Sequence, residues 1–333
     1  MPTYFIFSGV CDSGTYIRRG FRVAGSNLTG NARASNRGIG NEPNPRFFVV
    51  PHHRFMISII TAIFNQLPMN ILFYESVCRT TDGDWELIVI DNCSTDGSRE
   101  FFEYCERVRV IRNDKNFSYP HCQNQGIGVA NGDVLAFLNN DILLSPHWDS
   151  RLMMVLGKEQ NEILSLCSND RMPSYEQTQR MLKRWKFIRN VSLFLFGSSA
   201  TSLYLMMRLM YGKDFDGWCE KLWQEKGISL RPGFSGSAVI MTRQGLAMVG
   251  GRWDPTQQGA DYDMYLQTCK LHNDGLPIQP MSIVCGVYHH HFRRLTLNAK
   301  YPPFADADNL VSCEQKWGNE TVQNAIQYLR RNN

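Results

Sequence analysis

Apolar runs alternate with segments of helical spacing from residue 56 onward. Runs rich in β-branched residues predict buried strands at 57–64, 85–90, 108–111, 134–138, 236–241 and 283–288. Helices are expected between them, at 68–80, 97–106, 121–130, 146–156 and 261–270. Buried strands separated by helices predict an α/β fold with a Rossmann-like, mostly parallel central sheet flanked by helices.

Polar side chains stand where several of these strands end. They occur at Thr61 to Asn65, at Asp91-Asn92 and at Asn139 to Asp141. Ligands of parallel α/β sheets bind beyond the carboxyl ends of the strands. We therefore expect these side chains to line one site.

The alternation predicts one domain at 56–292. Three stretches do not follow the alternation: one before this domain, one within it and one after it. Residues 1–55 are rich in Gly, Asn, Arg and Ser without a sustained period, which predicts a flexible extension and makes Met56 a candidate natural start. Residues 171–230 predict a helical insert, and residues 293–333 a C-terminal helical tail.

The centre of the insert, residues 187–212, is apolar and aromatic but too polar for a spanning helix, which needs about 20 apolar residues. Basic residues precede it at Arg180, Lys183, Arg184, Lys186 and Arg189. One interpretation is a set of helices packed on the domain. The other is an interfacial hairpin, with about 180–212 giving peripheral contact with anionic lipid.

The composition and charge of the chain limit the kinds of ligand and the cell compartment that fit it. The 333 residues are 43% hydrophobic, enough for a sizeable core, and carry a formal net charge of +4. That mild excess fits anionic small molecules or a membrane surface and is too weak to indicate nucleic acid. The ten cysteines are scattered without a CxxC pair, and the first residues lack a signal-peptide pattern. These features favour a reducing, cytoplasmic location.

The polar strand ends suit a transferase that uses a nucleotide diphospho-sugar. Asp91 would accept a hydrogen bond from a nucleobase N–H; the alternative is that it caps the following turn. Asp141 would hold Mg²⁺ or Mn²⁺, with Asn139 and Asn140 adding carboxamides, since such ions take one or two carboxylates plus phosphate oxygens. An ordinary turn is the alternative for this segment.

The second half of the chain offers a candidate base. Asp261 or Asp263 would take the proton from an acceptor hydroxyl, and the alternative is a solvated acidic helix start. His289 to His291 would bind metal or phosphate, or form an ordinary histidine cluster.

Other nucleotide chemistries find less support. Gly126-Ile-Gly128 lies on a helix ahead of a strand, the wrong order for a dinucleotide loop. The segment 63–68 after the first strand has no Gly, Lys or Arg to grip a triphosphate, which argues against nucleotidyl transfer.

Nine short motifs follow one another along the chain. They are ISIITAIFN (57–65), ELIVIDNCSTDG (86–97), NQGI (124–127), ANGD (130–133), FLNND (137–141), GSAVI (236–240), VGG (249–251), DYDM (261–264) and VYH (287–289). This ordered set resembles family 2 glycosyltransferases. The resemblance spans about residues 56–292, interrupted by the insert.

The resemblance implies the GT-A fold, an inverting mechanism and a metal-bound nucleotide diphospho-sugar. By position, Asp261 resembles the catalytic base, Asp141 the last acid of the DxD metal motif, and His289 the late histidine near the metal. The donor side would comprise Thr61, Ala62, Asn65, Asp91, Asn92, Asn124, Asn139 and Asn140. The acceptor side would comprise Gly236, Ser237 and Asp263.

Some positions depart from the family pattern. The first acid of the DxD motif is Asn139, the usual Glu before the base is Ala260, and the usual later arginine is Gln267. The QxxRW signature of processive synthases and clear membrane spans are missing. We therefore expect transfer of a single sugar to a glycan, lipid-linked or protein acceptor. The alternative is a non-catalytic sugar-nucleotide-binding protein of the same fold.

Overall fold

The computed structural model describes residues 55–331 apart from Ser198 and residues 296–301. The expectations for residues 1–54 and for the start of the C-terminal tail therefore lie outside the described residues.

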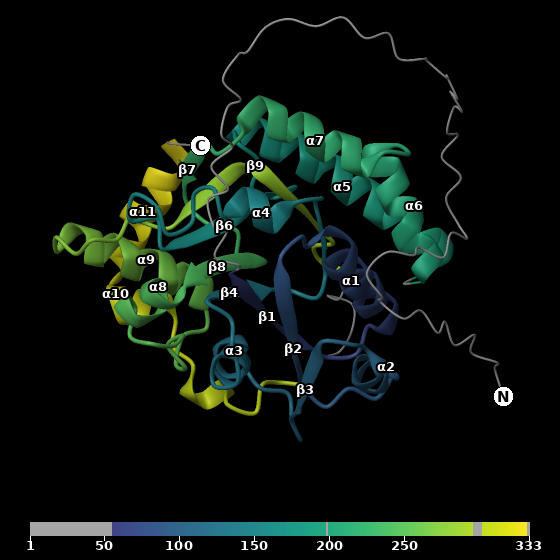
Figure 1. Ribbon diagram of the computed structural model, residues 1–333, viewed down its shortest axis with the longest axis horizontal. Helices are drawn as coiled ribbons and strands as arrows, with labels where there is room; N and C mark the ends of the chain where they lie inside the picture. The colour runs from purple at the N-terminus through teal and green to yellow at the C-terminus, as the bar shows by residue number, and fades with distance from the viewer. Residues whose placement is uncertain (1–54, 198, 296–301, 332–333) are drawn as a thin grey trace, which may run out of the picture. The chain divides into compact units, whose positions relative to one another are not determined.

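A central mixed sheet runs through the described chain in the order β3-β2-β1-β4-β8-β6-β9-β5, with β7 paired to β9 (Figure 1). The strands are β1 (Met56–Ile63), β2 (Asp84–Asp91), β3 (Val108–Arg112), β4 (Val134–Leu138), β5 (Ile142–Leu144), β6 (Ile163–Ser168), β7 (Leu230–Pro232), β8 (Ala238–Thr242) and β9 (Ser282–His291).

Helices connect most of the strands. They are α1 (Leu67–Thr80), α2 (Ser98–Tyr104), α3 (Tyr119–Ile127), α4 (Trp148–Leu152), α5 (Tyr175–Phe196), α6 (Ala200–Tyr211), α7 (Phe215–Lys226), α8 (Arg243–Met248), α9 (Ala260–Asn273), α10 (Cys313–Trp317) and α11 (Asn319–Arg331), with a 3₁₀ turn at Ala307–Asn309. The predicted alternation of strands and helices is thus confirmed for 56–138.

The direction of the strands changes midway across the sheet. Strands β3, β2, β1 and β4 are parallel, as expected, and β6 is parallel to β9. Strand β8 is antiparallel to both β4 and β6, and β5 and β7 are antiparallel to β9. An antiparallel neighbour needs no right-handed crossover, so a strand that follows the insert or a tight turn can run in the opposite direction to its neighbours.

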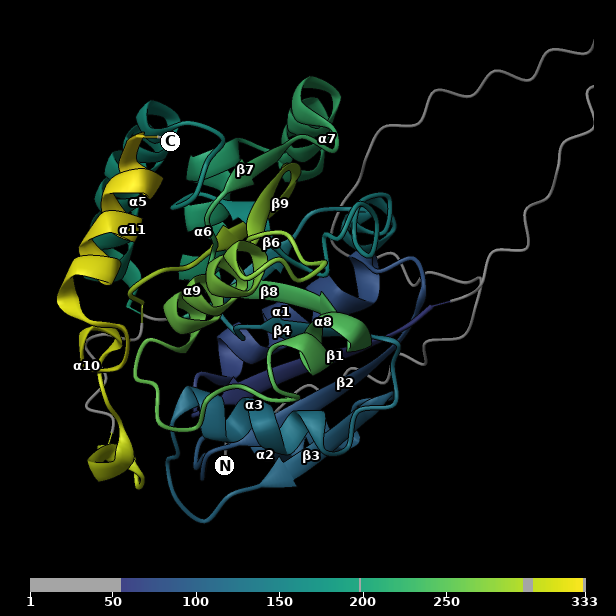
Figure 2. The same ribbon diagram turned by 90° about the vertical axis from the view of Figure 1, so that its left-hand side faces the viewer.

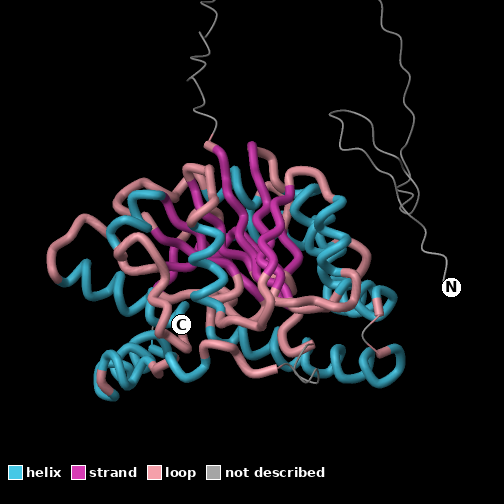
Figure 3. The backbone as a smooth tube through the Cα atoms, turned by 90° about the horizontal axis from the view of Figure 1, so that it is seen from below, coloured by secondary structure: helices cyan, strands magenta, loops and turns pink. Residues whose placement is uncertain are grey.

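Alternating side chains of each strand fill two cores on opposite faces of the sheet. Ile59 and Leu87 face the layer of α1, α2 and α4, whereas Ile60 and Ile88 face the layer of α3, α8, α9 and α11. Figure 2 views the sheet from the side of α3, α8 and α9, and Figure 3 shows the strands enclosed by helices. The α/β layering that we expected is confirmed.

The insert is helical and its inner face is packed. Trp185 of α5 and Met206 of α6 are buried together with Leu143 of β5 and Phe292 beyond β9. Helix α7 adds Cys219, which packs near the end of β9. The packed-helix interpretation is confirmed for this inner face. Among the described residues no helix has the length and apolar character needed to cross a bilayer.

Three local expectations were wrong. Helix α4 covers only Trp148–Leu152 of the expected 146–156, and β5 precedes it at Ile142–Leu144. Strand β9 does not stop before the histidines, because β5 pairs with it as far as His291. A strand of three residues is too short to show a period in the sequence.

Candidate active site

Asp141 lies in the turn between β4 and β5. Its backbone carbonyl accepts a hydrogen bond from the Phe292 N–H at 2.8 Å, which fixes the turn against the end of β9. Its Oδ2 lies 3.4 Å from Nε2 of His291. Its Oδ1 is buried and has no hydrogen-bond partner within the described chain. Such an atom is costly to bury unless something else satisfies it.

A second carboxylate, Asp170, lies on the other side of the His291 ring. Its Oδ2 is 3.5 Å from His291 Nδ1 and 3.7 Å from Arg293 Nη1, and its Oδ1 accepts a hydrogen bond from Ser168 Oγ at 2.5 Å. Burial alone would raise the pKa of Asp170, but His291 and the Ser168 hydroxyl hold it well below its ordinary value. Asp170 is therefore ionised.

His291 carries a positive charge between these two carboxylates. Burial alone would lower its pKa, but Asp141 and Asp170 together raise the pKa to about 10. Asn169 fixes the backbone here, since its Oδ1 accepts from the His291 N–H at 2.8 Å and its Nδ2 donates to the His291 carbonyl at 3.0 Å. The imidazolium thus holds the end of β9 against the ends of β4 and β6.

The neighbouring histidines have different partners. His289 is fully buried, and its Nε2 lies 2.8 Å from Ser237 Oγ. Burial and the charge of His291 lower the pKa of His289 to about 3, so its ring is neutral. His290 points to the opposite face, where its Nδ1 lies 2.7 Å from the Tyr211 hydroxyl. The histidine placed beside Asp141 is therefore His291, two residues beyond the one that the sequence suggested.

Serine hydroxyls connect the two sides of this cluster. Ser235 Oγ lies 3.3 Å from Ser168 Oγ and 3.2 Å from Ser237 Oγ. Ser168 reaches Asp170 and Ser237 reaches His289, so a chain of polar contacts runs from the end of β6 to β9. The Ser237 carbonyl also accepts from the Asn139 N–H at 2.9 Å.

Asp261 enters the cluster from the first turn of α9. Its carboxylate lies against the backbone of Gly236, where a Cβ would overlap with Oδ2. Burial raises the pKa of Asp261, backbone hydrogen bonds and the charge of Arg171 oppose the rise, and Asp170 adds to it. The Tyr119 hydroxyl is also close, since burial and then the charge of Asp261 raise the pKa of Tyr119.

Asp263 does not join this cluster. It is buried and turned toward α10, where its Oδ1 accepts from Trp317 Nε1 at 2.6 Å and pairs with Lys316 Nζ at 2.7 Å. Its Oδ2 accepts from Gln267 Nε2 at 2.9 Å. These contacts give Asp263 the role of tying α9 to the C-terminal helices.

The end of β2 forms a second polar region. Asp91 is buried, and its two oxygens accept from the Ser94 N–H at 3.0 Å and from Arg99 Nε at 2.7 Å. Asn65, at the end of β1, accepts from the Thr95 N–H at 2.7 Å. Thr61 is buried with its hydroxyl unpartnered among the described residues. The turn-capping alternative for Asp91 is therefore present in the fold.

Asn70 of α1 links the two polar regions. Its Nδ2 donates to the Asn65 carbonyl at 2.9 Å and to Ser98 Oγ at 2.8 Å, while its Oδ1 accepts from Asn140 Nδ2 at 2.7 Å. This fully buried side chain holds the loop after β1 beside the turn that carries Asp141.

Two other expected donor residues are bonded inside the fold. Asn92 Nδ2 donates to the Phe117 carbonyl at 3.0 Å, and Asn92 Oδ1 accepts from Asn113 Nδ2 at 2.9 Å. Asn124 exchanges two hydrogen bonds of 2.9 Å with the backbone of Trp253. Both side chains position loops near the strand ends. Ala62 is half-buried at the end of β1.

Asp170 and Arg171 were missed by the sequence reasoning. They follow the apolar run ILSLCS of β6, so the rule that singled out Asp91 and Asp141 applied to them as well. Arg171 Nε donates to the Phe234 carbonyl at 3.0 Å and Nη1 to the Asp170 carbonyl at 2.9 Å.

The residues around Asp141 fit a divalent ion held by few protein ligands. No group of three or more His, Cys, Asp or Glu side chains forms a metal cage in the part of the chain that the structure describes. Mg²⁺ is commonly bound by one or two carboxylates, with water and substrate phosphates completing the shell. The unpartnered Oδ1 of Asp141 suits that role.

Comparison with known proteins shows a similarity to glycosyltransferases. A family model described as glycosyl transferase family 2 matches residues 58–210. An uncharacterized glycosyltransferase of Haemophilus influenzae is 29% identical over 106 residues, 32% of this chain and 36% of that protein. The putative teichuronic acid biosynthesis glycosyltransferase TuaG of Bacillus subtilis is 30% identical over 90 residues, 26% of this chain and 36% of that protein. The chain thus spans little more than a third of the length of these relatives.

Solved structures of glycosyltransferases are similar at low sequence identity. The mannosyltransferase PcManGT from Pyrobaculum calidifontis, in complex with GDP-Man and Mn²⁺, is 15% identical, with a TM-score of 0.43, over 85% of this chain and 77% of that chain. GalNAc-T7 with UDP, GalNAc and Mn²⁺ is 15% identical, with a TM-score of 0.46, over 72% of this chain and 44% of that chain.

The family match begins within β1 and covers the strand ends that carry Asp91 and Asp141. The α/β layering around these ends is the fold expected for that family. The chain is thus similar to family 2 glycosyltransferases over residues 58–210, somewhat less than half of its length.

Proposed function

We propose that the protein transfers a single sugar from a nucleotide diphospho-sugar to an acceptor hydroxyl, with inversion at the anomeric carbon. One observation carries the proposal: Asp141 and Asp261, which lie 120 residues apart in the chain (261 − 141), reach the same cluster. Asp170 shares His291 with Asp141, and Asp261 lies against Gly236, which stands between Ser235 and Ser237 of the same polar chain.

Asp261 is the proposed general base. In the proposed reaction the acceptor oxygen bonds to the anomeric carbon as the bond from that carbon to the diphosphate oxygen breaks. The acceptor proton passes to Asp261, and the diphosphate leaves with the bonding electron pair. The pKa raised by burial supports this role, because a carboxylate that holds its proton more tightly is a stronger base. Gly236 leaves the space that Asp261 occupies.

Asp141 is the proposed ligand for Mg²⁺ or Mn²⁺. Such an ion supplies Lewis-acid stabilisation of the departing diphosphate when bound. The neutral ring of His289 is the candidate second ligand, since it lies on the side of β9 that faces Asp141. Asn139 and Asn140 would contact the diphosphate from the same turn.

The donor nucleoside is proposed to lie at the ends of β1 and β2. Each Asp91 oxygen accepts one hydrogen bond within the protein and retains a lone pair for a nucleobase N–H. The unpartnered Thr61 hydroxyl, Ala62 and Asn65 would line the same region. Asn92 and Asn124 would act on the donor through the loops that they hold.

A donor panel tests the proposal. Thermal shift with UDP-, GDP- and dTDP-sugars in Mn²⁺ should show stabilisation by at least one donor, because a ligand that binds only the folded state raises its stability. The stabilisation should fall when a chelator removes the metal. Donor hydrolysis measured in the same samples separates an enzyme from the non-catalytic alternative, which would bind a donor without turning it over.

We also propose that the insert meets an anionic membrane surface. Helix α5 exposes Phe194 at 88%, near the tip of the α5–α6 hairpin, and Phe187 at 71%, nearer the middle of the helix. Arg180, Lys183 and Lys186 lie on the same helix. Exposed aromatic groups beside basic ones are typical of interfacial helices. Contact of this protein surface with the cytoplasmic face of a membrane would bring the protein to a lipid-linked acceptor.

A further inference from the structure

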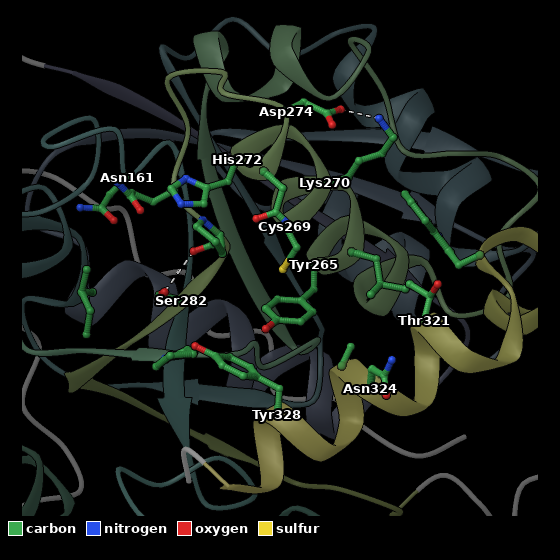
Figure 4. A pocket seen from close by; sticks show the side chains of 18 of the residues that line it. Asn161, Tyr265, Cys269, Lys270, His272, Asp274, Ser282, Thr321, Asn324 and Tyr328 are labelled. Carbon is green, nitrogen blue, oxygen red and sulfur yellow. Dashed lines mark hydrogen bonds and ion pairs between the residues drawn. The ribbon is translucent and has the colours of Figure 1, made fainter.

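A large open cavity lies away from the aspartate cluster. Its volume is about 1040 Å³, and it is lined by α9, α11 and the segments that lead into β6 and β9 (Figure 4). Ser282, at the start of β9, lines the cavity, whereas His289 of the cluster lies near the end of the same strand. Seven residues of strand separate them by about 23 Å. No residue of the aspartate cluster lines the cavity, which is therefore distinct from the proposed catalytic site, although Tyr265 lies one turn along α9 from Asp261.

Aromatic rings form part of the cavity wall. Tyr265 of α9 and Tyr328 of α11 line it (Figure 4), and Trp317 of α10 belongs to the same lining. Tyr265 is only 2% exposed, and Trp317 is held by its hydrogen bond to Asp263. Tyr328 is 51% exposed. Of the two tyrosines, Tyr328 therefore offers its ring to a ligand, whereas Tyr265 is buried in the wall.

Hydroxyl and amide groups stand beside these rings. Thr321, Asn324 and Tyr328 are spaced three and four residues apart on α11, so they share one helix face. Thr321 and Asn324 are exposed and make no side-chain hydrogen bond to any other residue that the structure describes. Asn161 lies on the facing wall. The lining therefore offers both donors and acceptors.

The charges of the lining nearly cancel. Lys270 and Asp274 pair with each other one helical turn apart, and His272 Nδ1 lies 3.0 Å from the Ile278 carbonyl. Glu159 is the remaining carboxylate of the lining. A phosphate or a nucleotide would require an excess of positive charge, and a cation would require several carboxylates. The cavity therefore suits a neutral ligand that is polar at its edges and apolar on its faces.

We infer that this cavity binds a neutral oligosaccharide. The C–H face of a sugar ring would lie on Tyr328, and its hydroxyls would bond to Thr321 and Asn324. The volume is close to the upper limit of the usual range of about 300–1000 Å³ for a small-molecule pocket, so the cavity has room for more than one sugar unit. Such a second site would hold a glycan at a distance from the aspartate cluster.

Titration of the full chain with neutral hexasaccharides tests the inference. The probes are cellohexaose, chitohexaose and mannohexaose, followed by calorimetry and by saturation-transfer NMR. At least one probe should bind with a dissociation constant of about 1 mM or tighter. Tyr328→Ala should weaken binding about tenfold, since it removes one stacking face. Asn324→Ala should weaken it severalfold. Tyr104→Ala, at a 91% exposed position on α2, should leave binding unchanged.

Absence of binding by all three probes would overturn the inference. So would binding that Tyr328→Ala leaves intact. Thermal shift with nucleotide sugars in the same samples reports on the proposed catalytic site separately. If a donor binds while no hexasaccharide does, this inference alone fails; if hexasaccharides bind and no donor does, the proposed function fails instead.

Discussion

The carboxylate of Asp261 occupies the space that a side chain at Gly236 would fill. The two residues lie on different elements, α9 and the segment that leads into β8. Their close approach places the proposed base directly beside Ser237, whose hydroxyl contacts His289. The absence of a side chain at Gly236 thus determines where the Asp261 carboxylate can lie.

Gly236→Ala is expected to reduce turnover about 10²-fold or more, because a methyl group would displace the proposed general base. Initial rates of donor hydrolysis or transfer measure the effect, and circular dichroism checks the fold. Gly128→Ala is the matched control, since its added Cβ would meet its nearest atom at 3.4 Å, an ordinary contact. Equal rates for the two variants would show that Asp261 is not constrained by Gly236.

Asp261→Asn should lose about 10²-fold or more in rate while keeping or gaining thermal stability. Burial raises the pKa of Asp261, so the folded state disfavours the charged form at neutral pH, and a neutral amide removes that cost. The melting temperature and kcat are measured together. A variant that is both fully active and less stable would contradict the assignment.

The same raised pKa sets a pH dependence for the native protein. The base must be ionised to accept a proton, so kcat/KM should fall as pH drops through a value above the ordinary 3.8 of an aspartate. The acidic limb should be absent from the residual activity of Asp261→Asn. A native rate that stays constant down to pH 4 would exclude Asp261 as the base.

Asp170→Asn should lower the free energy of unfolding by about 3 kcal/mol near pH 6 without metal, because it leaves His291 with one carboxylate. The pKa of Asp170 is depressed, so its contribution is present above the unfolded value and is lost as pH falls. The pKa of His291 is raised to about 10, so its contribution is lost as pH rises through that value.

Urea unfolding at several pH values should therefore show the largest difference between Asp170→Asn and the native chain near pH 6. Asp274→Asn removes an exposed pair with Lys270 and should change stability by less than about 0.5 kcal/mol. A pH-independent difference for Asp170→Asn would mean that its ion pair with His291 does not stabilise the fold.

Phe194→Ser should weaken binding to anionic vesicles about tenfold, since burying an exposed aromatic side chain contributes roughly 1.5–3 kcal/mol. Co-sedimentation with vesicles containing phosphatidylglycerol measures the effect. Tyr104→Ser, an equally exposed aromatic position on α2, serves as the control. Equal losses of vesicle binding in both variants, or no vesicle binding by the native chain, would show that the insert does not contact the membrane.

Much of the parallel half of the fold was readable from the sequence. Strands such as VLAFL of β4 are apolar throughout and end in polar residues, so both the strand and Asp141 could be predicted. The orientation of the histidine side chains could not be predicted. It depends on the pairing of Ile142 with His291, and β5 is too short to leave a periodic signal.

The individual side-chain roles were harder to predict. Asp261 and Asp263 are two residues apart, about 200° around a helix, so only one could face the cluster, and the spacing does not say which. Asn70 gave no signal, because a polar residue within a helix looks solvent-exposed until α1 is placed against the turn that holds Asn140. The position of Asp170 after an apolar run could have indicated its role, but β6 was not predicted as a strand.

Crystals soaked with Mn²⁺ and either UDP or GDP test the central claim most directly. The anomalous signal of manganese should place one ion at about 2 Å from a carboxylate oxygen of Asp141, bridged to the diphosphate, with Asp261 in the same cleft. An ion bound elsewhere while the nucleotide is present, or a diphosphate remote from both aspartates, would contradict the account.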